Sequence, residues 1–358
     1  MKIAIAMSGG VDSSLAASLL KKEGHDVVGL TFRMWPKEEC GSSFGKACCN
    51  LEAIMRARAV AEDLGIPYYV IDFSDSFKKE VIDYFCREYL KGLTPNPCIM
   101  CNEKIKFGLL LDKARQLGAS SIATGHYARI DYNKKSKRFL LKTGKDKLKD
   151  QSYFLFSLSQ NQLKNAVFPL GNFTKNKVRD MAKSFKLKTF DTASSQDVCF
   201  ISDTNYVEYI KKRTGVEMAE GDIVDKEGNV LGRHKGIPFY TIGQRRGLGI
   251  AHAQPLYVTA IDIKNNRLIV GVKKDVLRKS LVADRLNWIS VDGIEEPIKV
   301  LAKIRYNHKK AKAVVTRLGK DRVRVEFSKP QEAPTPGQAV VFYNKDVVIG
   351  GGWIREAE

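Results

Sequence analysis

The sequence of 358 residues predicts an α/β fold: a doubly wound parallel sheet at the N-terminus, followed by two small all-β domains. Two patterns lead to this prediction. As far as about residue 205, short apolar runs alternate with helical patterns of 10–15 residues, which is typical of a parallel sheet. Beyond that point, short β-branched runs are separated by turn signals, which favours small barrels or sheets. We therefore expect domains at residues 1–205, 206–280 and 281–358.

The N-terminal pattern predicts four strands and four helices. The strands are expected at 2–7, 26–32, 67–73 and 121–125, and the helices at 15–23, 50–64, 76–90 and 104–117. Ligands of such sheets bind outside the carboxyl ends of the strands. Asp12, Phe32 and the pair Gly125-His126 all follow strand ends, so we expect them along one edge of the sheet.

The C-terminal pattern predicts a series of short strands. Candidates are 256–262, 268–272, 299–304, 311–317, 322–327 and 339–343, with a division near 275–285. No internal repeat or low-complexity segment interrupts them.

Composition restricts the partners and the compartment. The chain has 60 Lys and Arg against 40 Asp and Glu, a formal net charge of +20, which fits either a polyanionic partner such as nucleic acid or a solubility function. The densest basic stretch, 134–149, favours a solvated loop over a functional patch, although it follows Gly125-His126 closely and could grip the phosphates of a nucleic acid. No run approaches the ~18 apolar residues of a membrane span. Seven cysteines without a secretory signal predict a reducing, cytoplasmic location.

The turn at residues 8–13, Ser-Gly-Gly-Val-Asp-Ser, joins the first strand to the first helix. Such a turn leaves backbone N–H groups free for an anion, and glycine lets the backbone approach a ligand. Asp12 beside phosphate implies a cation such as Mg²⁺ between them. The residue pattern excludes a Walker loop, which needs Lys followed by Ser or Thr after its last glycine, and a dinucleotide fingerprint, which needs three spaced glycines. It matches the pyrophosphate-binding loop of enzymes that split ATP between the α and β phosphates to form an adenylate.

Three cysteines are candidates for chemistry. Cys98 and Cys101 form a CxxC pair in a loop that Pro95 and Pro97 restrict. We expect Cys101 near the start of the next helix, where the dipole favours the thiolate. Cys199 lies far along the chain. The three thiols could ligate an iron–sulfur cluster with one open iron, or act as a sulfur-handling pair plus a spare, and the sequence leaves both open.

A set of motifs resembles one family, the tRNA-specific 2-thiouridylases, which thiolate the wobble uridine of certain tRNAs. The motifs extend along nearly the whole chain. They are Met7–Ser14, Thr94–Pro97, Cys101-Asn102, Ile105–Phe107, Ala123–Tyr127, Lys149–Phe154, Ser195–Asp197, Cys199–Ile201, Tyr240–Gly249, Ile304–Tyr306 and Pro336–Ala339. Their order along the chain makes the resemblance specific.

The resemblance implies a role for each matched residue. The implied ATP site comprises Ala6, Met7, Ser8, Gly9, Gly10, Val11, Asp12, Ser13, Phe32 and Gly125. Cys101 is the implied nucleophile and Cys199 the implied bearer of a persulfide. Asn96, Pro97 and Cys98 would lie beside the target base, and the implied tRNA contacts are His126, Lys149, Asp150, Gln151, Arg305, Tyr306 and Gln338. Many members have Asp where this chain has Cys98, and the replacement strengthens the case for a three-thiol cluster.

The implied reaction adenylates the C2 oxygen of uracil with ATP and Mg²⁺ and then replaces it by persulfide sulfur, releasing AMP and pyrophosphate. Cys101 would either release sulfide from the Cys199 persulfide or resolve it after direct attack, leaving a disulfide. A variant would hold sulfide on a [4Fe–4S] cluster. The implied partners are tRNA and a sulfur donor, either a cysteine desulfurase or a sulfur-relay protein. The alternatives are a cluster-dependent RNA-thiolating ATP pyrophosphatase, a small-molecule adenylating synthetase and a non-catalytic RNA-binding protein.

Overall fold

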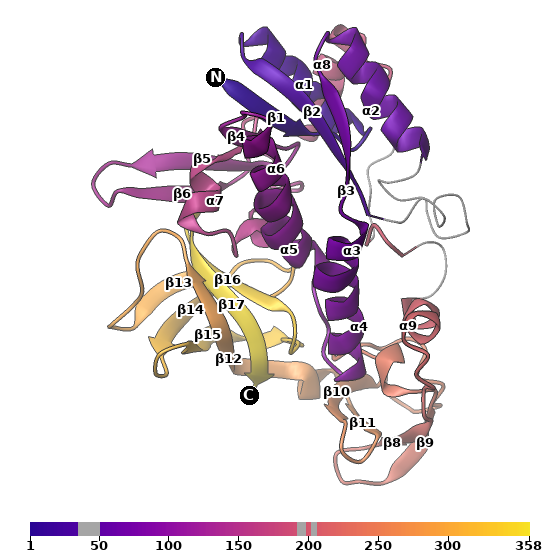
Figure 1. Ribbon diagram of the computed structural model, residues 1–358. Coiled ribbons are helices and arrows are strands. Elements are labelled where there is room, and N and C mark those ends of the chain that lie inside the picture. The colour runs from indigo at the N-terminus through magenta and orange to yellow at the C-terminus, as the bar shows by residue number, and fades with distance from the viewer. Residues whose placement is uncertain (35–50, 192–197, 202–205) are drawn as a thin grey trace.

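The computed structural model describes residues 1–34, 51–191, 198–201 and 206–358. Their strands form three sheets, which lie in three parts of the molecule (Figure 1). The N-terminal sheet is at the top, the C-terminal barrel lies below it on one side, and the central sheet lies at the bottom.

The N-terminal sheet has five parallel strands in the order β3-β2-β1-β4-β7. They are β1 (Lys2–Ala6), β2 (Asp26–Arg33), β3 (Tyr68–Asp72), β4 (Ser121–Ala123) and β7 (Ala166–Val167). One face packs on α1 (Val11–Lys22), α2 (Leu51–Asp63) and α8 (Lys175–Ser184). The other face packs on α6 (Leu110–Gln116). Helices on both faces confirm the doubly wound prediction.

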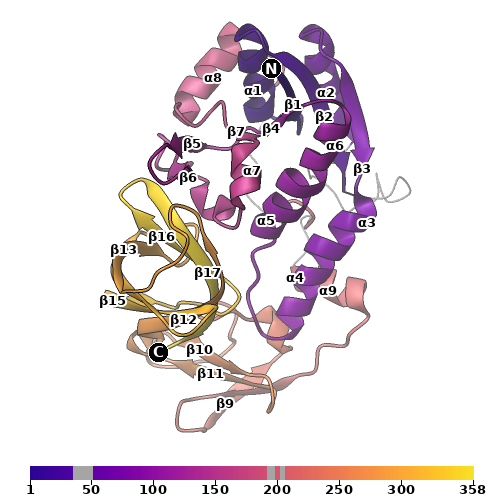
Figure 2. The same cartoon turned by 60° about the vertical axis from the view of Figure 1, so that its left-hand side comes forward.

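Two long helical segments descend from this sheet toward the other two (Figure 2). The first joins α3 (Ser74–Phe77), the π-helical η2 (Lys78–Ile82) and α4 (Asp83–Leu90). The second, here called the cysteine helix, joins α5 (Pro97–Met100), the π-helical η3 (Cys101–Leu109) and α6. The prediction that this helix starts at Lys104 is wrong, because Pro97 begins it at the first helical position. Proline suits that position, where its fixed φ is helical and no N–H is needed.

The expectation of a solvated loop at 134–149 is wrong for residues 138–143, which form a strand, whereas six of the seven lysines in the stretch are exposed. β5 (Ala128–Asn133) and β6 (Arg138–Thr143) form an antiparallel hairpin around residues 134–137. Leu141 is fully buried, and Tyr132 packs across the strands on Phe139 with ring centroids 4.9 Å apart. The lysines between these residues hide the alternation in the sequence. Short helices follow: η4 (Ser152–Leu155) and α7 (Gln160–Lys164).

The central region opens with a helix, α9 (Tyr206–Thr214), where the sequence pattern predicted only strands. Its apolar face belongs to the same hydrophobic cluster as Phe200 and as Phe85 of α4. A four-stranded sheet follows in the order β10-β11-β8-β9. Its strands are β8 (Gly221–Val224), β9 (Val230–His234), β10 (Tyr257–Asp262) and β11 (Arg267–Gly271), with the short helices η5 (Ile237–Phe239) and η6 (Lys273–Val276) beside them.

The C-terminal strands close into a barrel. They are β12 (Leu277–Trp288), β13 (Ile298–Lys303), β14 (Ala311–Arg317), β15 (Arg322–Glu332), β16 (Ala339–Asn344) and β17 (Val347–Ala357). Closure follows because β12 pairs with both β15 and β17. β12 begins before the boundary expected at residue 281. The N-terminal hairpin extends this sheet, with Lys142 of β6 opposite Val347 of β17.

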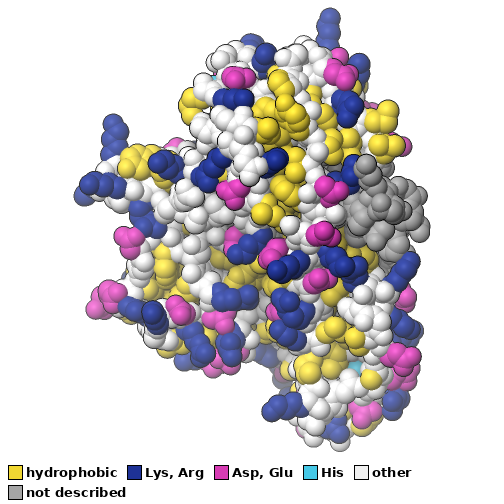
Figure 3. Space-filling view, viewed as in Figure 1, with side chains coloured by type: hydrophobic (Ala, Val, Ile, Leu, Met, Phe, Trp, Pro, Cys, Tyr) yellow, Lys and Arg dark blue, Asp and Glu magenta, His cyan; other side chains and the backbone are white. Residues whose placement is uncertain are grey.

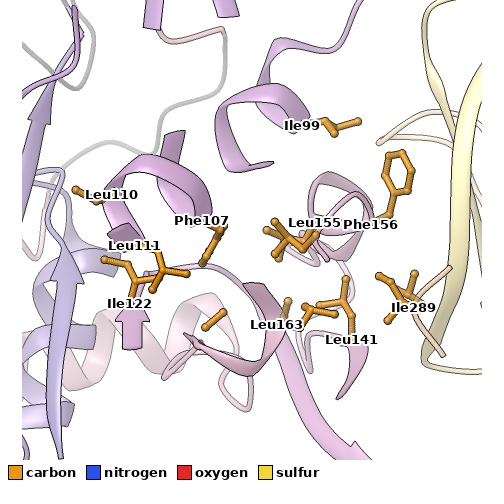
Figure 4. Close-up of a cluster of buried hydrophobic side chains, with 14 of the residues drawn as sticks. Ile99, Phe107, Leu110, Leu111, Ile122, Leu141, Leu155, Phe156, Leu163 and Ile289 are labelled. Atoms are coloured by element: carbon orange, nitrogen blue, oxygen red, sulfur yellow. The ribbon is translucent and has the colours of Figure 1, made fainter. Parts of the chain in front are cut away.

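One hydrophobic cluster joins the N-terminal sheet to the barrel. Figure 4 shows Ile99 and Phe107 of the cysteine helix directed toward Leu155 and Phe156, with Ile289 on the barrel side. The cluster continues into the barrel through Tyr343 and Trp353. The cysteine helix therefore packs on the barrel as well as on its own sheet.

Two surface properties bear on partners. Lys and Arg side chains are scattered over the upper, middle and lower parts of the face seen in Figure 3, so the basic excess is not confined to one region of that face. Among the described residues, no helix combines the length and the apolar character needed to cross a membrane.

Candidate active site

The turn at residues 8–13 follows β1 and includes the first residues of α1, at the carboxyl edge of the N-terminal sheet. Gly9 has φ +71°, and a Cβ there would lie 2.3 Å from the carbonyl oxygen of Ala53. Only glycine fits this position. Ser13 closes the turn, because its Oγ accepts from the backbone N–H of Ser8 at 3.1 Å and donates to the carbonyl of Gly10 at 3.1 Å.

The Asp12 carboxylate is held by two side chains from other elements. The Lys175 ammonium at the start of α8 lies 2.6 and 2.7 Å from its two oxygens. The Tyr127 hydroxyl donates to Oδ1 at 2.8 Å. Burial, and then the Asp12 charge, raise the pKa of Tyr127, which keeps that hydroxyl protonated as a donor. The Asp12 carboxylate is thus paired with the positive charge of Lys175.

The structure places the other predicted ATP-site residues around this turn. Gly125 lies against it, since a Cβ there would fall 2.9–3.0 Å from backbone atoms of Asp12 and Ser13. The Met7 carbonyl accepts from the Thr31 hydroxyl at 2.6 Å, which ties Ala6-Met7 to the end of β2. Phe32 is partly buried there, with its ring 6.3 Å from that of Phe73. The prediction that strand ends gather these residues at one edge is confirmed for the turn and Gly125.

The two cysteines predicted to be catalytic belong to one hydrophobic cluster. Cys101 is buried in it with Phe77, Ile105 and Phe200, and Cys199 is partly buried against it. The Cys199 thiol lies 4.0 Å from the sulfur of Met34. Cys86, Cys98, Cys101 and Cys199 are the cysteines among the described residues; Cys86 and Cys101 are buried, and Cys98 and Cys199 are partly buried. Cys40, Cys48 and Cys49 lie outside the described residues.

The position of Cys101 in its helix differs from the expected one. Because the helix begins at Pro97, the N–H of Cys101 already bonds to the Pro97 carbonyl. Cys98, at the second helical position, is closer to the positive end of the dipole. Asn96 is the residue before the helix, and its side chain makes no capping bond.

The iron–sulfur cluster that the sequence left open as one alternative is not shown by the described residues. The described part of the chain contains no group of three or more His, Cys, Asp or Glu side chains arranged to hold a metal ion. Within the described part of the chain, Cys98, Cys101 and Cys199 are not arranged as a metal-ligand set. The oxygens of Asp12 are the hard ligands that Mg²⁺ prefers, so the turn fits a magnesium-bound phosphate.

The predicted tRNA contacts near residue 150 have structural partners. The buried Asp150 carboxylate accepts from the N–H groups of Gly144 and Ser152 at 3.0 and 3.1 Å. The Gln151 side-chain oxygen accepts from the Tyr127 N–H at 2.9 Å. Lys149 is exposed. Their contact with tRNA stays a prediction.

His126 is buried rather than open to a ligand. Its ring lies 6.0 Å from that of Phe107 and 5.9 Å from that of Phe168, and Nδ1 is 2.6 Å from the Thr124 hydroxyl. Burial, and then the charge of Lys106, hold the pKa of His126 well below its usual range. The ring is neutral at physiological pH.

The remaining predicted tRNA contacts lie where the barrel meets the start of the cysteine helix. Gln338 donates to the Thr94 carbonyl at 2.8 Å, and Arg305 donates to the Ile242 carbonyl at 2.9 Å. Tyr306 stacks on Phe154 with ring centroids 4.5 Å apart. All three side chains take part in contacts between regions of the chain.

Sequence reasoning missed Lys175 and the part that Tyr127 plays at Asp12. Lys175 is 163 positions from Asp12, and no spacing rule connects them. The local signal was the Thr174 hydroxyl, which accepts from the Lys177 N–H and begins α8. That signal predicts a helix start, and only the tertiary fold turns this start toward Asp12.

The fold and the turn at residues 8–13 define a nucleotide-binding α/β protein with appended β domains. Family models match along the chain. A tRNA methyl transferase HUP domain matches residues 1–203, a tRNA methyl transferase PRC-barrel domain 207–272, and an aminomethyltransferase beta-barrel domain 278–354.

Similar proteins cover the whole chain. A tRNA-specific 2-thiouridylase MnmA 2 of Thermoanaerobacter sp. (strain X514) is 52% identical over 99% of this chain and 98% of its own. Proteins named MnmA from Acetivibrio thermocellus and Clostridioides difficile are 49% and 46% identical, over 99% of this chain and 99% and 98% of their own lengths. The chain belongs to the tRNA-specific 2-thiouridylase family.

Proposed function

We propose that this protein is an ATP-dependent tRNA-uridine 2-sulfurtransferase that thiolates the wobble uridine. The observation that carries the proposal is the turn at residues 8–13, with its glycine-limited conformation and Asp12 at the carboxyl edge of the sheet, in a chain 52% identical over 99% of its length to a named 2-thiouridylase. The full-length relatives do not favour a small-molecule synthetase or a non-catalytic RNA-binding protein.

The first half-reaction activates the C2 oxygen of uracil, because oxide itself does not leave. That oxygen attacks the α-phosphorus of ATP, and pyrophosphate departs. Backbone N–H groups at the start of α1 would hold the departing phosphates. Mg²⁺, when bound, would take Asp12 as its protein ligand and neutralise phosphate charge. Lys175, then freed from Asp12, would place its ammonium on the pyrophosphate.

The second half-reaction replaces the adenylate by sulfur. A persulfide on Cys199 supplies the outer sulfur to C2, and AMP leaves. Cys101 attacks the inner sulfur, either before or after the C–S bond forms, and both routes end in a Cys101–Cys199 disulfide. A two-electron thiol reductant then restores the free thiols. Membership of both cysteines in one cluster supports this pairing.

The partners follow from this chemistry. tRNA is the substrate, and its base must leave the stack to expose C2. The persulfide on Cys199 requires a protein donor, which we propose to be a cysteine desulfurase or a sulfur-relay protein. We place the reaction in the cytoplasm, where tRNA and reduced thiols occur together. The division at residues 1–205, 206–280 and 281–358 stays our proposal for the domains.

Cysteine variants test the assignment. With tRNA, ATP and a persulfide donor, Cys199→Ala should release pyrophosphate but form no 2-thiouridine, whereas Lys175→Met should lose both products. Cys86→Ala is the control, because Cys86 lies in the same cluster and burial raises the pKa of its thiol to about 11. Thiolation by Cys199→Ala at the wild-type rate would show that Cys199 is not the sulfur carrier.

A further inference from the structure

The segment that carries Cys98 and Cys101 is held from outside the N-terminal sheet. Thr94 lies three positions before Pro97, the first residue of the cysteine helix. Its N–H donates to the Pro336 carbonyl of the barrel at 2.9 Å, and its carbonyl accepts from the Gln338 side chain at 2.8 Å. A second donation from Gln338 reaches the Pro95 carbonyl at 3.3 Å.

The barrel approaches this segment as closely as a backbone can. Gly337 has φ +90°, and a Cβ there would lie 2.8 Å from the Thr94 nitrogen and 3.0 Å from its oxygen. The Gly337 N–H bonds to the Ile354 carbonyl, and the Ile354 N–H bonds to the Gln338 carbonyl. The Gln338 side chain is therefore presented from backbone that β17 fixes.

Arg305 links the barrel to the central region at the same place. Its guanidinium donates to the Ile242 carbonyl at 2.9 Å, to the Ala333 carbonyl at 3.0 Å, and to the Thr335 hydroxyl. The neighbouring Thr241 hydroxyl lies 3.3 Å from that of Thr94. These hydrogen bonds connect Thr94 to residues 241–242, residues 241–242 to Arg305, and Arg305 to the segment 333–338. That segment in turn bonds back to Thr94 through Gln338.

The far side of the cysteine pair is also fixed. The Asn102 side chain donates to the Phe154 carbonyl at 3.1 Å, and Phe154 stacks on Tyr306 of the barrel. Ile99, between the two cysteines, is fully buried in the cluster shared with the barrel. Residues flanking the cysteines on both sides thus depend on the barrel for their position.

We infer that Gln338 and Arg305 are positioning residues, which set the location of the Cys98–Cys101 segment from the barrel before tRNA binds. This inference rests on the proposed role of Cys101. A misplacement of about 1 Å costs roughly 100-fold in rate, so a nucleophile on a segment with external supports depends on those supports. tRNA docking at the same side chains would then act directly on the nucleophile segment.

The test measures Cys101 alkylation by iodoacetamide in tRNA-free protein, resolved from Cys98 by peptide mass spectrometry. Gln338→Leu should raise the Cys101 rate roughly tenfold, since it removes two hydrogen bonds that hold the segment closed around a buried thiol. Gln331→Leu is the matched control, because Gln331 lies in the same barrel and its side chain donates to the carbonyls of Lys329 and Pro330 in its own strand. Thr241→Val is a milder second variant that should raise the same rate severalfold.

The catalytic readouts separate positioning from tRNA contact. For Gln338→Leu, the single-turnover thiolation rate at saturating tRNA should fall at least about tenfold, while the ATP dissociation constant stays unchanged. An alkylation rate equal to that of Gln331→Leu and wild type, in both Gln338→Leu and Thr241→Val, would overturn the inference, whatever happens to tRNA affinity. The tRNA thiolation activity of Cys101→Ser tests the proposed function separately, and we expect this variant to be inactive.

Discussion

At the scale of single residues, the two adjacent glycines in the turn at residues 8–13 differ in whether their backbone conformation and surroundings require glycine. Gly9 combines φ +71° with a Cβ position 2.3 Å from the Ala53 carbonyl oxygen. Gly10 has φ −95°, and the nearest atom to its Cβ position is the Ser8 hydroxyl at 3.6 Å. The sequence shows the same letter twice, and only the backbone distinguishes them.

Gly9→Ala should therefore lower the free energy of unfolding by about 1–3 kcal/mol, through a disfavoured φ and a backbone clash. Gly10→Ala is the matched control and should change it by less than about 0.5 kcal/mol. Urea unfolding of the ligand-free protein measures both values. Equal losses in the two variants would contradict the conformational role of Gly9.

His126 gives the folded protein a pH dependence. Its pKa is well below the usual range in the folded state, whereas the unfolded chain takes up a proton below about pH 6.5. Stability is therefore complete above pH 6.5 and falls as the pH is lowered, by up to about 1.4 kcal/mol per pH unit for one group. Burial also lowers the pKa of His234, which acts in the same direction.

His126→Asn should flatten this decline between pH 6.5 and 5.0, as measured by urea unfolding at each pH. The same substitution at the exposed His252 is the control. A decline that keeps its full slope in His126→Asn would show that His126 does not take up a proton on unfolding.

At the scale of elements, the β5–β6 hairpin is the clearest case where sequence reasoning failed. Lysines dominate residues 134–149, yet Arg138 of this stretch donates to the carbonyls of Trp288 and Ile289 in the barrel, at 2.9 and 2.8 Å. Those bonds join positions about 150 residues apart, and such pairings leave no local periodicity. The regular α/β alternation, in contrast, follows from local patterns and was predicted nearly strand for strand.

Arg138→Ala should lower the free energy of unfolding by about 1–3 kcal/mol, because partly buried carbonyls lose their donor. Lys135→Ala, at the exposed tip of the same hairpin, should have almost no effect. Chemical denaturation provides the numbers, and faster proteolysis at residues 133–138 should accompany the loss in Arg138→Ala. An unfolding free energy unchanged in both variants would show that the junction does not contribute.

The candidate site shows the same division between local and tertiary information. The turn at residues 8–13 and the candidate cysteines could be read from the sequence, since each is a local motif. Lys175, Tyr127 and the contacts of Gln338 and Arg305 could not, since each depends on how distant elements pack. The helix start at Pro97 was missed although proline at the first helical position is a local signal.

At the scale of the whole molecule, a net charge of +20 on a tRNA-binding enzyme predicts strong salt dependence. If the protein neutralises four to six phosphates, its affinity for tRNA should fall roughly 100- to 1,000-fold when the salt concentration rises from 50 to 200 mM. Lys149→Gln should reduce the slope of log affinity against log salt by about 1, whereas Lys226→Gln, at the exposed β8–β9 turn, should not. Filter binding at several salt concentrations gives the slopes. Equal slopes in the two variants would show that Lys149 does not contact a tRNA phosphate.

In the proposed reaction, the enzyme splits one ATP to form an adenylate for each sulfur that it places on the wobble uridine. The most direct measurement incubates purified protein with unmodified tRNA, ATP and a persulfide donor, and counts the products by mass spectrometry and nucleotide analysis. We expect AMP, pyrophosphate and 2-thiouridine at the wobble position in a 1:1:1 ratio. Formation of ADP and phosphate, or thiolation without ATP, would contradict it.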